Sequence, residues 1–289
     1  MIRILCVGLA TVDLVYGVPV IPRADEKAQA SSLVIAAGGP AANAAVAASA
    51  LGAEVTLVTA VGAHPLGDLV REDLRERGVR LVDVDPHYPG PPPVSSVIVR
   101  EPGGERTIVS RNGGDRAARV PEGGLPDADL TLVDGHHPAL AVAAARAARR
   151  LLVDAGSWRP VFREIFPHAE VVACSAAFRH PAAAATSAAT VTGSSARADA
   201  AVAAAIGAPH VAVTHGPAPV TWFSGGRSGV VAVPRVAAVD TAGAGDAFHG
   251  ALAVALARGE ELPVALASAV RVAGVRVVHP GPRAWLDAL

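Results

Sequence analysis

Short apolar runs alternate along the chain with longer stretches in which alanine and arginine recur at helical spacing. The apolar runs predict buried strands at Ile2–Gly8, Val55–Val61, Leu130–Val133, Leu151–Asp154, Val171–Ala173 and Val211–Thr214. The stretches between them predict helices at Pro40–Leu51, Asp68–Arg77, Ala139–Arg150, Arg197–Ile206 and Leu262–Val278. This alternation is typical of a mostly parallel sheet covered on both faces, so we expect one doubly wound α/β domain over residues 1–289.

A glycine-spaced turn precedes a helical stretch near the end of the chain. The turn is Asp240–Asp246, and the alanine-rich segment Ala247–Leu256 follows it. Backbone N–H groups at the start of a helix bind anions, and Gly243 and Gly245 let a phosphate approach the backbone closely. Asp246 then lies beside that anion, suited to accept the proton of a hydroxyl that attacks the phosphate. The motif predicts phosphoryl transfer to an alcohol. A structural strand-to-helix turn, with Asp246 stabilised by the helix dipole, is the alternative.

A second glycine block lies near the beginning of the chain. Gly38 and Gly39 directly precede a predicted helix, and Asn43 lies in its first turn. Glycines admit a sugar against the backbone, and the Asn43 amide offers one donor and one acceptor to a vicinal diol. Upstream, we interpret the apolar run that starts at Val7 as a buried first strand ending in an acid, Asp13. An ordinary alanine-rich helix and a turn aspartate are the alternatives.

Together these motifs resemble the two signatures of the ribokinase-like (PfkB) family of sugar and nucleoside kinases. The Asp-Thr-x-Gly-Ala-Gly-Asp heptapeptide is the more specific match, and the matching sites follow the family's order over almost the whole chain. The resemblance implies that Asp246 is the catalytic base. It implies an anion hole formed by Gly243, Ala244 and Gly245. It also implies a sugar site formed by Asp13, Gly38, Gly39 and Asn43.

Two segments interrupt the alternation of strands and helices. Val15–Ile35 and Ser95–Ser110 contain alternating strand-like pieces, and Pro102–Glu105 is a turn sequence within the second. In the resembled family the corresponding segments, approximately residues 15–35 and 95–110 here, form a small β-sheet lid over the sugar. A lid excludes water and so protects the transferred phosphoryl group from hydrolysis. The exposed face of such a sheet often pairs with a second subunit, so the resemblance also implies a homodimer formed through the lid.

The resemblance further implies ATP as the phosphoryl donor. Ligands of doubly wound folds bind at the carboxyl ends of the strands, where we expect Thr214 and Gly216 to contact the nucleotide. Mg²⁺ is expected because a triphosphate needs its charge neutralised for transfer. In the family the segment matching Asp240 and Thr241 often helps to bind a monovalent cation, so we expect stimulation by K⁺. One departure concerns magnesium: Cys174–Ala177 stands where many members carry an Asn-x-x-Glu motif.

Composition limits the partners and the location. The formal net charge is −1, which gives no electrostatic reason to expect nucleic acid or an anionic membrane as a partner. Lys27 is the only lysine, which excludes a phosphate loop of the Walker type. Cys6 and Cys174 lie on separate predicted strands without a metal or disulfide pattern, which fits a reducing cytoplasm. With no signal-peptide pattern and no apolar stretch long enough to span a bilayer, we expect a cytoplasmic protein.

Within the family, the chain is most similar to the ketohexokinase and sulfofructose kinase branch. The similarity rests on Gly38–Asn43, Gly104–Ile108 and Asp246–Leu256. It implies a ketose or ketose-like sugar as the acceptor. Arg106 and Arg111, in or just after the predicted lid hairpin, are candidates to bind an anionic substituent such as a sulfonate, with solvated lid charges as the alternative.

Two other functions stay open. Purine-nucleoside kinases share both signatures but usually offer aromatic side chains to stack the base, and aromatics make up only 3% of this chain. A catalytically silent sugar-binding protein on the same fold is favoured by the missing Asn-x-x-Glu motif and opposed by the intact Asp246. His136 and His137 follow a predicted strand in the expected cleft. Without a third ligand, they are better interpreted as a polar lining than as a metal site.

Overall fold

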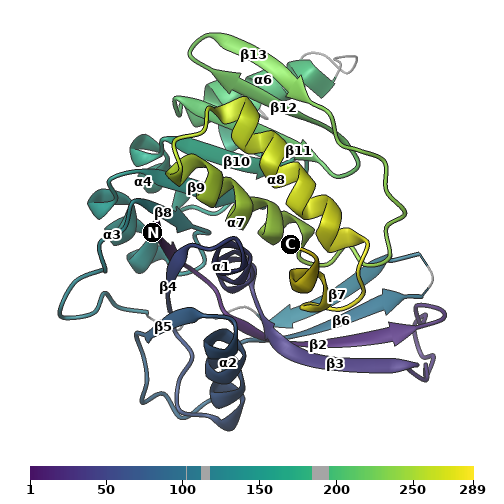
Figure 1. Ribbon diagram of the computed structural model, residues 1–289. Coiled ribbons are helices and arrows are strands. Elements are labelled where there is room, and N and C mark those ends of the chain that lie inside the picture. Colours follow the sequence, from purple (N-terminus) through teal and green to yellow (C-terminus); the bar gives the residue numbers. More distant parts are fainter. Residues whose placement is uncertain (102, 112–117, 184–194) are drawn as a thin grey trace.

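The computed structural model describes residues 1–101, 103–111, 118–183 and 195–289, and a nine-stranded sheet forms its centre (Figure 1). The strands of this sheet are β1 (Arg3–Val7), β4 (Glu54–Thr59), β5 (Val79–Asp83), β8 (Leu130–Val133), β9 (Leu151–Ala155), β10 (Val171–Ser175), β11 (His210–His215), β12 (Ala218–Ser224) and β13 (Arg227–Val231). Their order is β13-β12-β11-β10-β9-β8-β1-β4-β5. All neighbours from β11 to β5 are parallel, whereas β12 and β13 are antiparallel additions at one edge.

A separate four-stranded sheet lies below the large one in Figure 1. It consists of β2 (Thr11–Val18), β3 (Ser32–Gly38), β6 (Val94–Arg100) and β7 (Arg106–Arg111), in the order β3-β2-β6-β7. Its central pair, β2 and β6, is parallel, and the outer pairs are antiparallel. The two segments that break the strand–helix alternation in the sequence therefore contribute strands to one small sheet. Pro102, in the predicted turn, lies outside the described residues.

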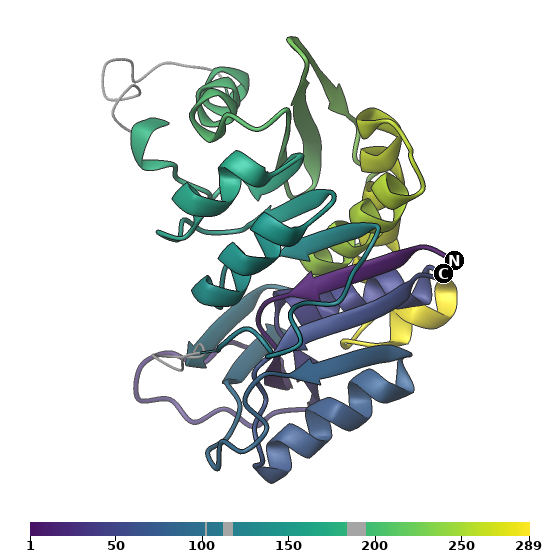
Figure 2. The ribbon, with the colours of Figure 1, turned by 90° about the vertical axis from the view of Figure 1, so that its left-hand side faces the viewer.

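Helices cover both faces of the large sheet (Figure 2). One face carries α1 (Pro40–Ala50), α2 (Pro65–Glu76), α7 (Ala244–Ala257) and α8 (Leu262–Val277). The other carries α3 (Pro138–Ala147), α4 (Phe162–Ile165), the short helix η1 (Phe166–His168) and α6 (Ser195–Ile206). A final short helix, η2 (Ala284–Ala288), follows α8. Side chains alternate across β1, with Ile4 and Cys6 in the first core and Leu5 and Val7 in the second. This confirms the doubly wound α/β fold.

Small residues bring α7 into close contact with α1. A Cβ atom added at Gly250 would lie 2.3 Å from the backbone oxygen of Ala44 and 2.8 Å from the Cβ of Ala47. Only glycine fits there, because a contact under 3.0 Å requires one of the two helices to move. The alanine-rich composition of both helices thus has a structural purpose, since it brings the first turns of α1 and α7 next to each other.

The prediction that the first strand continues to Asp13 is wrong. After β1 the chain leaves the large sheet, and Asp13 is the third residue of β2 in the small sheet. The backbone N–H of Leu9 donates to Oδ2 of Asp134 (2.8 Å), and that of Ala10 donates to Oγ1 of Thr59 (3.2 Å). Side chains thus take hydrogen bonds that a neighbouring strand would otherwise supply. The apolar pattern does not reveal this change of sheet, because residues on both sides of it are buried.

Several helix boundaries also differ from the predictions. Helix α2 begins at Pro65 because Nδ1 of His64 accepts the backbone N–H of Leu66 and caps the helix. Helix α3 ends at Ala147, before Arg150, whose guanidinium instead binds Glu170 at 2.7 and 2.8 Å. The strands β5, β12 and β13 do not follow from the sequence patterns described above.

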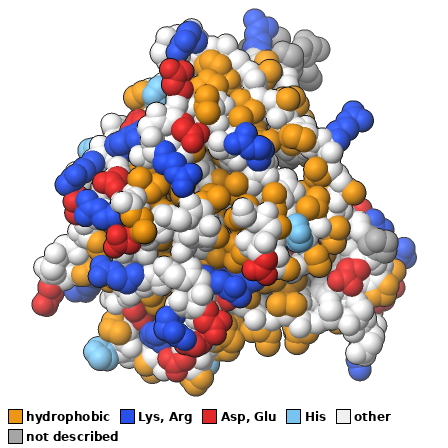
Figure 3. All heavy atoms as spheres, viewed as in Figure 1, with side chains coloured by type: hydrophobic (Ala, Val, Ile, Leu, Met, Phe, Trp, Pro, Cys, Tyr) orange, Lys and Arg blue, Asp and Glu red, His pale blue; other side chains and the backbone are white. Residues whose placement is uncertain are grey.

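The surface has no dominant charge on the side that carries α7 and α8. Positively and negatively charged side chains are interspersed there with hydrophobic ones (Figure 3), in keeping with the net charge of −1. In the described part of the chain, no helix combines the length and the apolar character needed to cross a membrane.

Candidate active site

The predicted anion turn lies at the start of α7. Gly243 caps the helix in a left-handed conformation, with φ of 68°, which a residue with a side chain adopts only at a cost. Gly245 is exposed, and a Cβ atom added to it would meet nothing within 4 Å. The first N–H groups of a helix lack partners within the helix, so the open side of this turn can bind an anion.

Asp246 lies in the first turn of α7 and accepts a hydrogen bond from Nδ2 of Asn43 at 2.8 Å. Burial raises its pKa to about 6, and the negative charge of Asp154 acts in the same direction. The Asn43 hydrogen bond and the nearby His249 oppose this shift. A carboxylate with a pKa close to neutrality is suited to accept a proton during catalysis and to release it afterwards.

Asn43 connects Asp246 to the C-terminal segment. While Nδ2 of Asn43 donates to Asp246, its Oδ1 accepts from Nη1 of Arg283 at 3.2 Å. Arg283 also donates to the backbone oxygen of Ala37 (2.6 Å) and forms an ion pair with Asp73 of α2 (2.7 Å). The chain of contacts from Asp73 to Asp246 thus fixes the orientation of the Asn43 amide. Because both the Nδ2 and the Oδ1 of that amide have protein partners, Asn43 can form fewer hydrogen bonds to a diol than a free amide could.

The predicted sugar-binding residues lie on β2, at the end of β3 and at the start of α1. Oδ1 of Asp13 accepts a hydrogen bond from Oγ1 of Thr11 at 2.6 Å. Burial raises the pKa of Asp13, opposed by hydrogen bonds from Thr11 and Ser95. A Cβ atom added at Gly38 would lie 2.0 Å from the Asp13 carboxylate, and Gly39 adopts a φ of 93°. Both glycines are therefore required by the local geometry.

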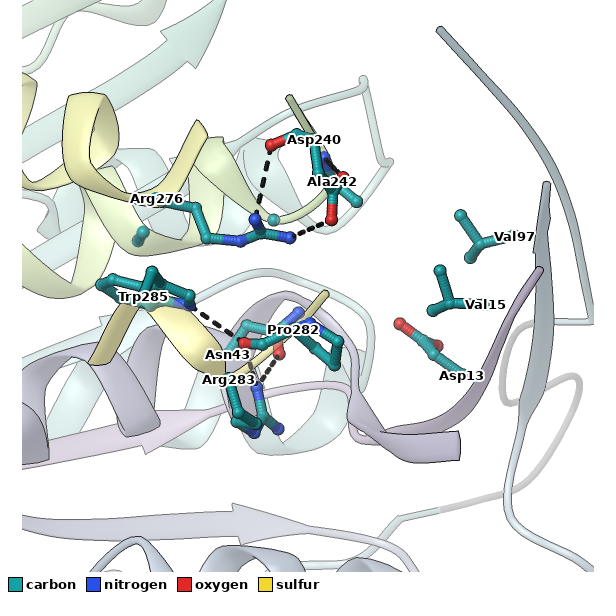
Figure 4. Close-up of a pocket in the computed structure, with 12 residues that line it drawn as sticks. Asp13, Val15, Asn43, Val97, Asp240, Ala242, Arg276, Pro282, Arg283 and Trp285 are labelled. Carbon is teal, nitrogen blue, oxygen red and sulfur yellow. Dashed lines mark hydrogen bonds and ion pairs between the residues drawn. The ribbon is translucent and has the colours of Figure 1, made fainter. Parts of the chain in front are cut away.

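These two sites face one pocket (Figure 4). The small sheet contributes Asp13, Val15 and Val97; the α1 and α7 regions contribute Asn43, Gly243 and Ala247; and the remaining lining residues are Asp240, Ala242, Arg276, Pro282, Arg283 and Trp285. The C-terminal contributions, Arg276 to Trp285, had no sequence motif to indicate them. The pocket thus brings the Asp13 carboxylate of the small sheet and the glycine turn at the start of α7 to one cavity.

The tip of the β6–β7 hairpin contacts the segment before the anion turn. Nη1 of Arg106 donates to Oγ1 of Thr241 at 2.6 Å, and that hydroxyl donates to the backbone oxygen of Gly104 at 3.3 Å. A Cβ atom added at Gly104 would lie 2.9 Å from the backbone oxygen of Val239. Arg106 therefore contacts the residue that lies between Asp240 and Ala242, both of which line the pocket. Arg111 is at the far end of β7, where it is exposed.

The predicted nucleotide residues lie at the end of β11. Oγ1 of Thr214 donates to the backbone oxygen of Cys174 at 3.4 Å, and Gly216 forms the turn to β12 with a φ of 60°. At the end of β10, Oγ of Ser175 donates to the backbone oxygen of Gly156 at 3.0 Å. These positions share the carboxyl edge of the parallel strands, where ligands of such folds bind. Their contact with a nucleotide stays a prediction.

A buried polar cluster at the ends of β8 and β9 does not follow from the sequence motifs. Oδ2 of Asp154 lies 3.3 Å from Nδ1 of His249, and Oδ1 of Asp134 lies 3.2 Å from Nδ1 of His136. Burial raises the pKa of Asp154. For Asp134, burial is outweighed by the charge and hydrogen bonds of His136, which hold its pKa well below its usual range. The sequence signal that could have indicated this cluster is Asp134, which directly follows the buried strand β8.

The two histidines predicted as a polar lining differ in their surroundings. Nε2 of His136 lies 2.5 Å from Nη2 of Arg159, and burial lowers the pKa of that arginine. His137 is buried at the start of α3. Within the described ranges, no group of three or more His, Cys, Asp or Glu side chains is placed to hold a metal ion.

Comparisons with known proteins agree with this geometry. The model of the pfkB family of carbohydrate kinases matches residues 1–288. Ribokinase from Bacillus subtilis is 27% identical over 288 residues, covering 96% of this chain and 94% of that protein. Mouse ketohexokinase is 33% identical over a shorter segment of 107 residues, which covers 37% of this chain and 36% of that protein.

Solved structures resemble the whole chain. A protein from Agrobacterium tumefaciens, provisionally classed as a ribokinase, has a TM-score of 0.81 at 25% identity, with 99% of this chain and 94% of that chain covered. Adenosine kinase from Sinorhizobium meliloti has a TM-score of 0.79 at 21% identity, with coverage of 99% and 98%. Ribokinase from Arabidopsis thaliana, solved with ribose and ATP, has a TM-score of 0.74 at 22% identity, with coverage of 99% and 98%. The chain therefore belongs to the pfkB family of carbohydrate kinases and is a phosphotransferase that acts on a hydroxyl group.

Proposed function

We propose that this enzyme transfers the γ-phosphoryl group of ATP to a hydroxyl of a ketose or ketose-like sugar. The observation that carries the proposal is the position of Asp246. Its carboxylate has a pKa near neutrality and lies in the first turn of α7, next to the open glycine turn and beside the pocket that contains Asp13. This arrangement supports the proposal because the candidate base, the candidate anion site and the candidate sugar site lie close together.

In the proposed reaction, the sugar lies between Asp13 and the anion turn. Asp246 accepts the proton of the attacking hydroxyl while that oxygen forms a bond to the γ-phosphorus of ATP, and the bond from this phosphorus to the leaving oxygen of ADP breaks. The N–H groups of the Gly243–Gly245 turn stabilise the negative charge on the transferred group. Asp13 and the backbone at Gly39 hold the remaining hydroxyls, so positioning accounts for much of the rate.

We propose that ATP binds along the carboxyl ends of β10 and β11, near Thr214 and Gly216. Mg²⁺ would neutralise the phosphates. Asp154 is the candidate to hold it, because this buried carboxylate lies near the end of β9, the strand that pairs with β10. The segment Cys174–Ala177 supplies no carboxylate for this purpose. Replacement of Asp154 by Asn should therefore raise the Mg²⁺ concentration required for half-maximal activity, and an unchanged requirement would refute this assignment.

We also propose a homodimer formed through the small sheet. Its strands β3 and β7 expose the large apolar side chains Leu33, Ile35 and Val109 on one face, with exposed fractions of 51%, 48% and 68%. Apolar groups gathered on one sheet are typical of a surface that pairs with another subunit. Sedimentation analysis of the wild type and of Val109→Asp tests this proposal. A wild-type monomer at all concentrations would exclude it.

A nucleoside is the alternative acceptor, since an adenosine kinase shares the fold. Among the described residues that line the pocket, Trp285 is the only aromatic, and it is 3% exposed with Nε1 donating to the backbone oxygen of Pro282 at 2.9 Å. A side chain buried in this way presents little ring surface for a base to stack on. The pocket therefore favours a sugar over a purine nucleoside.

Turnover of a substrate panel tests the proposal. Fructose, tagatose, ribose, sulfofructose and adenosine would each be incubated with Mg-ATP, with ADP and the phosphorylated product measured. We expect a ketose to be the best substrate, and Asp246→Asn to lower its kcat by roughly two to four orders of magnitude while sugar binding persists. Asp68→Asn, an exposed aspartate in α2, is the matched control and should act as the wild type. Equal turnover by Asp246→Asn, or turnover of adenosine alone, would refute the proposal.

A further inference from the structure

A buried arginine lies directly behind the anion turn. Arg276, in the last turn of α8, is 3% exposed, and its guanidinium faces Asp240, the first residue of the turn motif (Figure 4). Nη2 donates to Oδ2 of Asp240 at 2.9 Å. Nη1 donates to the backbone oxygens of Asp240, at 3.3 Å, and of His279, at 3.0 Å. The guanidinium is thus bound by one carboxylate and two carbonyl groups.

Oxygen ligands of this kind are the ones that hard cations prefer. In this chain the guanidinium already occupies them. The remaining capacity of the Asp240 carboxylate is also used, since Oδ2 accepts from the backbone N–H of Gly281 at 3.1 Å and Oδ1 accepts from that of Ala242 at 2.9 Å. A potassium ion at Asp240 would compete for the same oxygens and would lie next to a fixed positive charge. The K⁺ site expected from the sequence therefore does not fit these residues.

The contacts also connect Arg276 to the geometry of the catalytic turn. The backbone N–H of Ala242 donates to the Asp240 carboxylate, which fixes the position of Ala242. The next residue is Gly243, which caps α7. Nε of Arg276 lies 3.9 Å from the position that a Cβ atom on Gly243 would occupy. The guanidinium thus lies against the turn and supports it as part of the pocket wall.

We propose that Arg276 serves as a tethered monovalent cation, so that this enzyme does not depend on potassium. Arg276 is a positioning residue in this scheme, since it acts through Asp240 and the turn. Because a guanidinium keeps its charge at all working pH values, the turn holds its shape regardless of the ionic composition of the solvent. The role in turnover rests on the proposed kinase function, whereas the binding of a cation to the protein can be measured without any substrate.

The experiment compares KCl with choline chloride at equal ionic strength. For the wild type, we expect the same turnover and the same midpoint of thermal unfolding in both salts. In Arg276→Met, the buried Asp240 loses its charge partner, so we expect a lower unfolding midpoint and lower turnover in choline chloride, both partly restored by KCl. Arg276→Lys keeps a positive charge and should stay insensitive to potassium. Arg271→Met, on the same helix at an exposed position, is the matched control and should resemble the wild type.

Activation or thermal stabilisation of the wild type by KCl would overturn the proposal. So would an Arg276→Met enzyme that is as stable and as active as the wild type in choline chloride. If Arg276→Met does not fold, Arg276→Lys decides the matter, since potassium dependence of that variant would contradict a tethered cation. Should no substrate be turned over, the proposed kinase function fails, while the unfolding midpoints still test whether Arg276 replaces the ion.

Discussion

The two sides of the pocket are built in different ways. On the side of the α7 turn, the proposed anion side, charged side chains are fixed by partners: the buried Asp240 is paired with Arg276, and the partly buried Asp246 accepts a hydrogen bond from Asn43. On the side of β2 and β3, the proposed sugar side, the geometry depends on missing side chains, since any Cβ at Gly38 would collide with the Asp13 carboxylate. Charged side chains can change the pKa of a group that transfers a proton or can bind ions. A glycine, in contrast, only determines which ligand has room to bind. Variants on the anion side should therefore alter kcat and its pH dependence, and variants on the sugar side should alter KM.

The largest effect among these variants is expected for Gly38→Ala. The added methyl group would overlap the Asp13 carboxylate, and strain of this kind costs about 1–3 kcal/mol, so KM for the sugar should rise up to about a hundredfold with a smaller change in kcat. Gly274→Ala, where an added Cβ meets nothing within 4 Å, is the control for the glycine-to-alanine change. Steady-state kinetics measure both. A large loss of kcat with unchanged KM would contradict the division between the two sides.

Arg283→Met should have the next largest effect, because it connects the two sides. Its removal frees Oδ1 of Asn43 and leaves Asp73 without its ion pair. A hydrogen bond to a charged group contributes about 1.5–3 kcal/mol, so we expect kcat to fall by about thirtyfold. A loosened Asn43 also stabilises the Asp246 carboxylate less, so the pH profile should shift to higher pH. Arg258→Met, whose Nη2 binds only the backbone oxygen of Leu51 among the interactions found, is the control.

An unshifted pH profile in Arg283→Met would mean that the arginine acts on stability alone. Thermal unfolding of the same variant separates the two effects, because a purely structural role lowers the unfolding midpoint without moving the profile.

The pH dependence of the wild type comes next in size. Asp246 must be deprotonated to act as a base, and its pKa is raised to about 6, so activity is lost as the pH falls through that value. We expect kcat/KM to rise about tenfold between pH 5 and pH 7 and then to level off. Asn43→Ala removes a hydrogen bond that favours the charged carboxylate, so its profile should rise at higher pH. Identical profiles for the two proteins would show that another group controls the reaction.

The smallest effect is expected for Arg106→Ala with a neutral ketose. Arg106 is exposed, contacts Thr241 and is not among the residues that line the pocket, so KM for a neutral sugar should hardly change. With an anionic ketose, loss of a charge-assisted contact worth about 1.5–3 kcal/mol should raise KM more than tenfold. Arg227→Ala, on β13, is the control. An equal effect on both sugars would assign Arg106 to the hairpin rather than to the substrate.

Local motifs explain why part of the structure could be predicted. The turn that ends in Asp246 and the glycines before α1 are determined within a few residues, by helix-start geometry and by glycine conformation, so the sequence displays them directly. The strand–helix alternation is equally local. The small sheet was recognisable as an interruption, although its first strand begins before the predicted segment, at Thr11.

The features that the sequence did not reveal depend on distant partners. Arg276 reads as an ordinary basic residue in the last turn of a helix, and only the fold brings Asp240 against it. Likewise, Asp73 and Arg283 are 210 residues apart in sequence and give no local pattern. Asn43 was correctly placed in its helix, but the occupation of its amide by Asp246 and Arg283 depends on three separate elements.

The close packing of α1 on α7 has a consequence for how the protein is made. Residues 40–50 emerge from the ribosome long before residues 244–257, yet each helix buries its small apolar side chains against the other. Until α7 is synthesised, the growing chain exposes the alanine surface of α1 and lacks both Asp246 and the turn that precedes it. Contacts of such large sequence separation slow folding and favour aggregation of partly folded chains. Growth at lower temperature or with added chaperones should therefore increase the yield of folded enzyme more than its thermal stability alone would suggest.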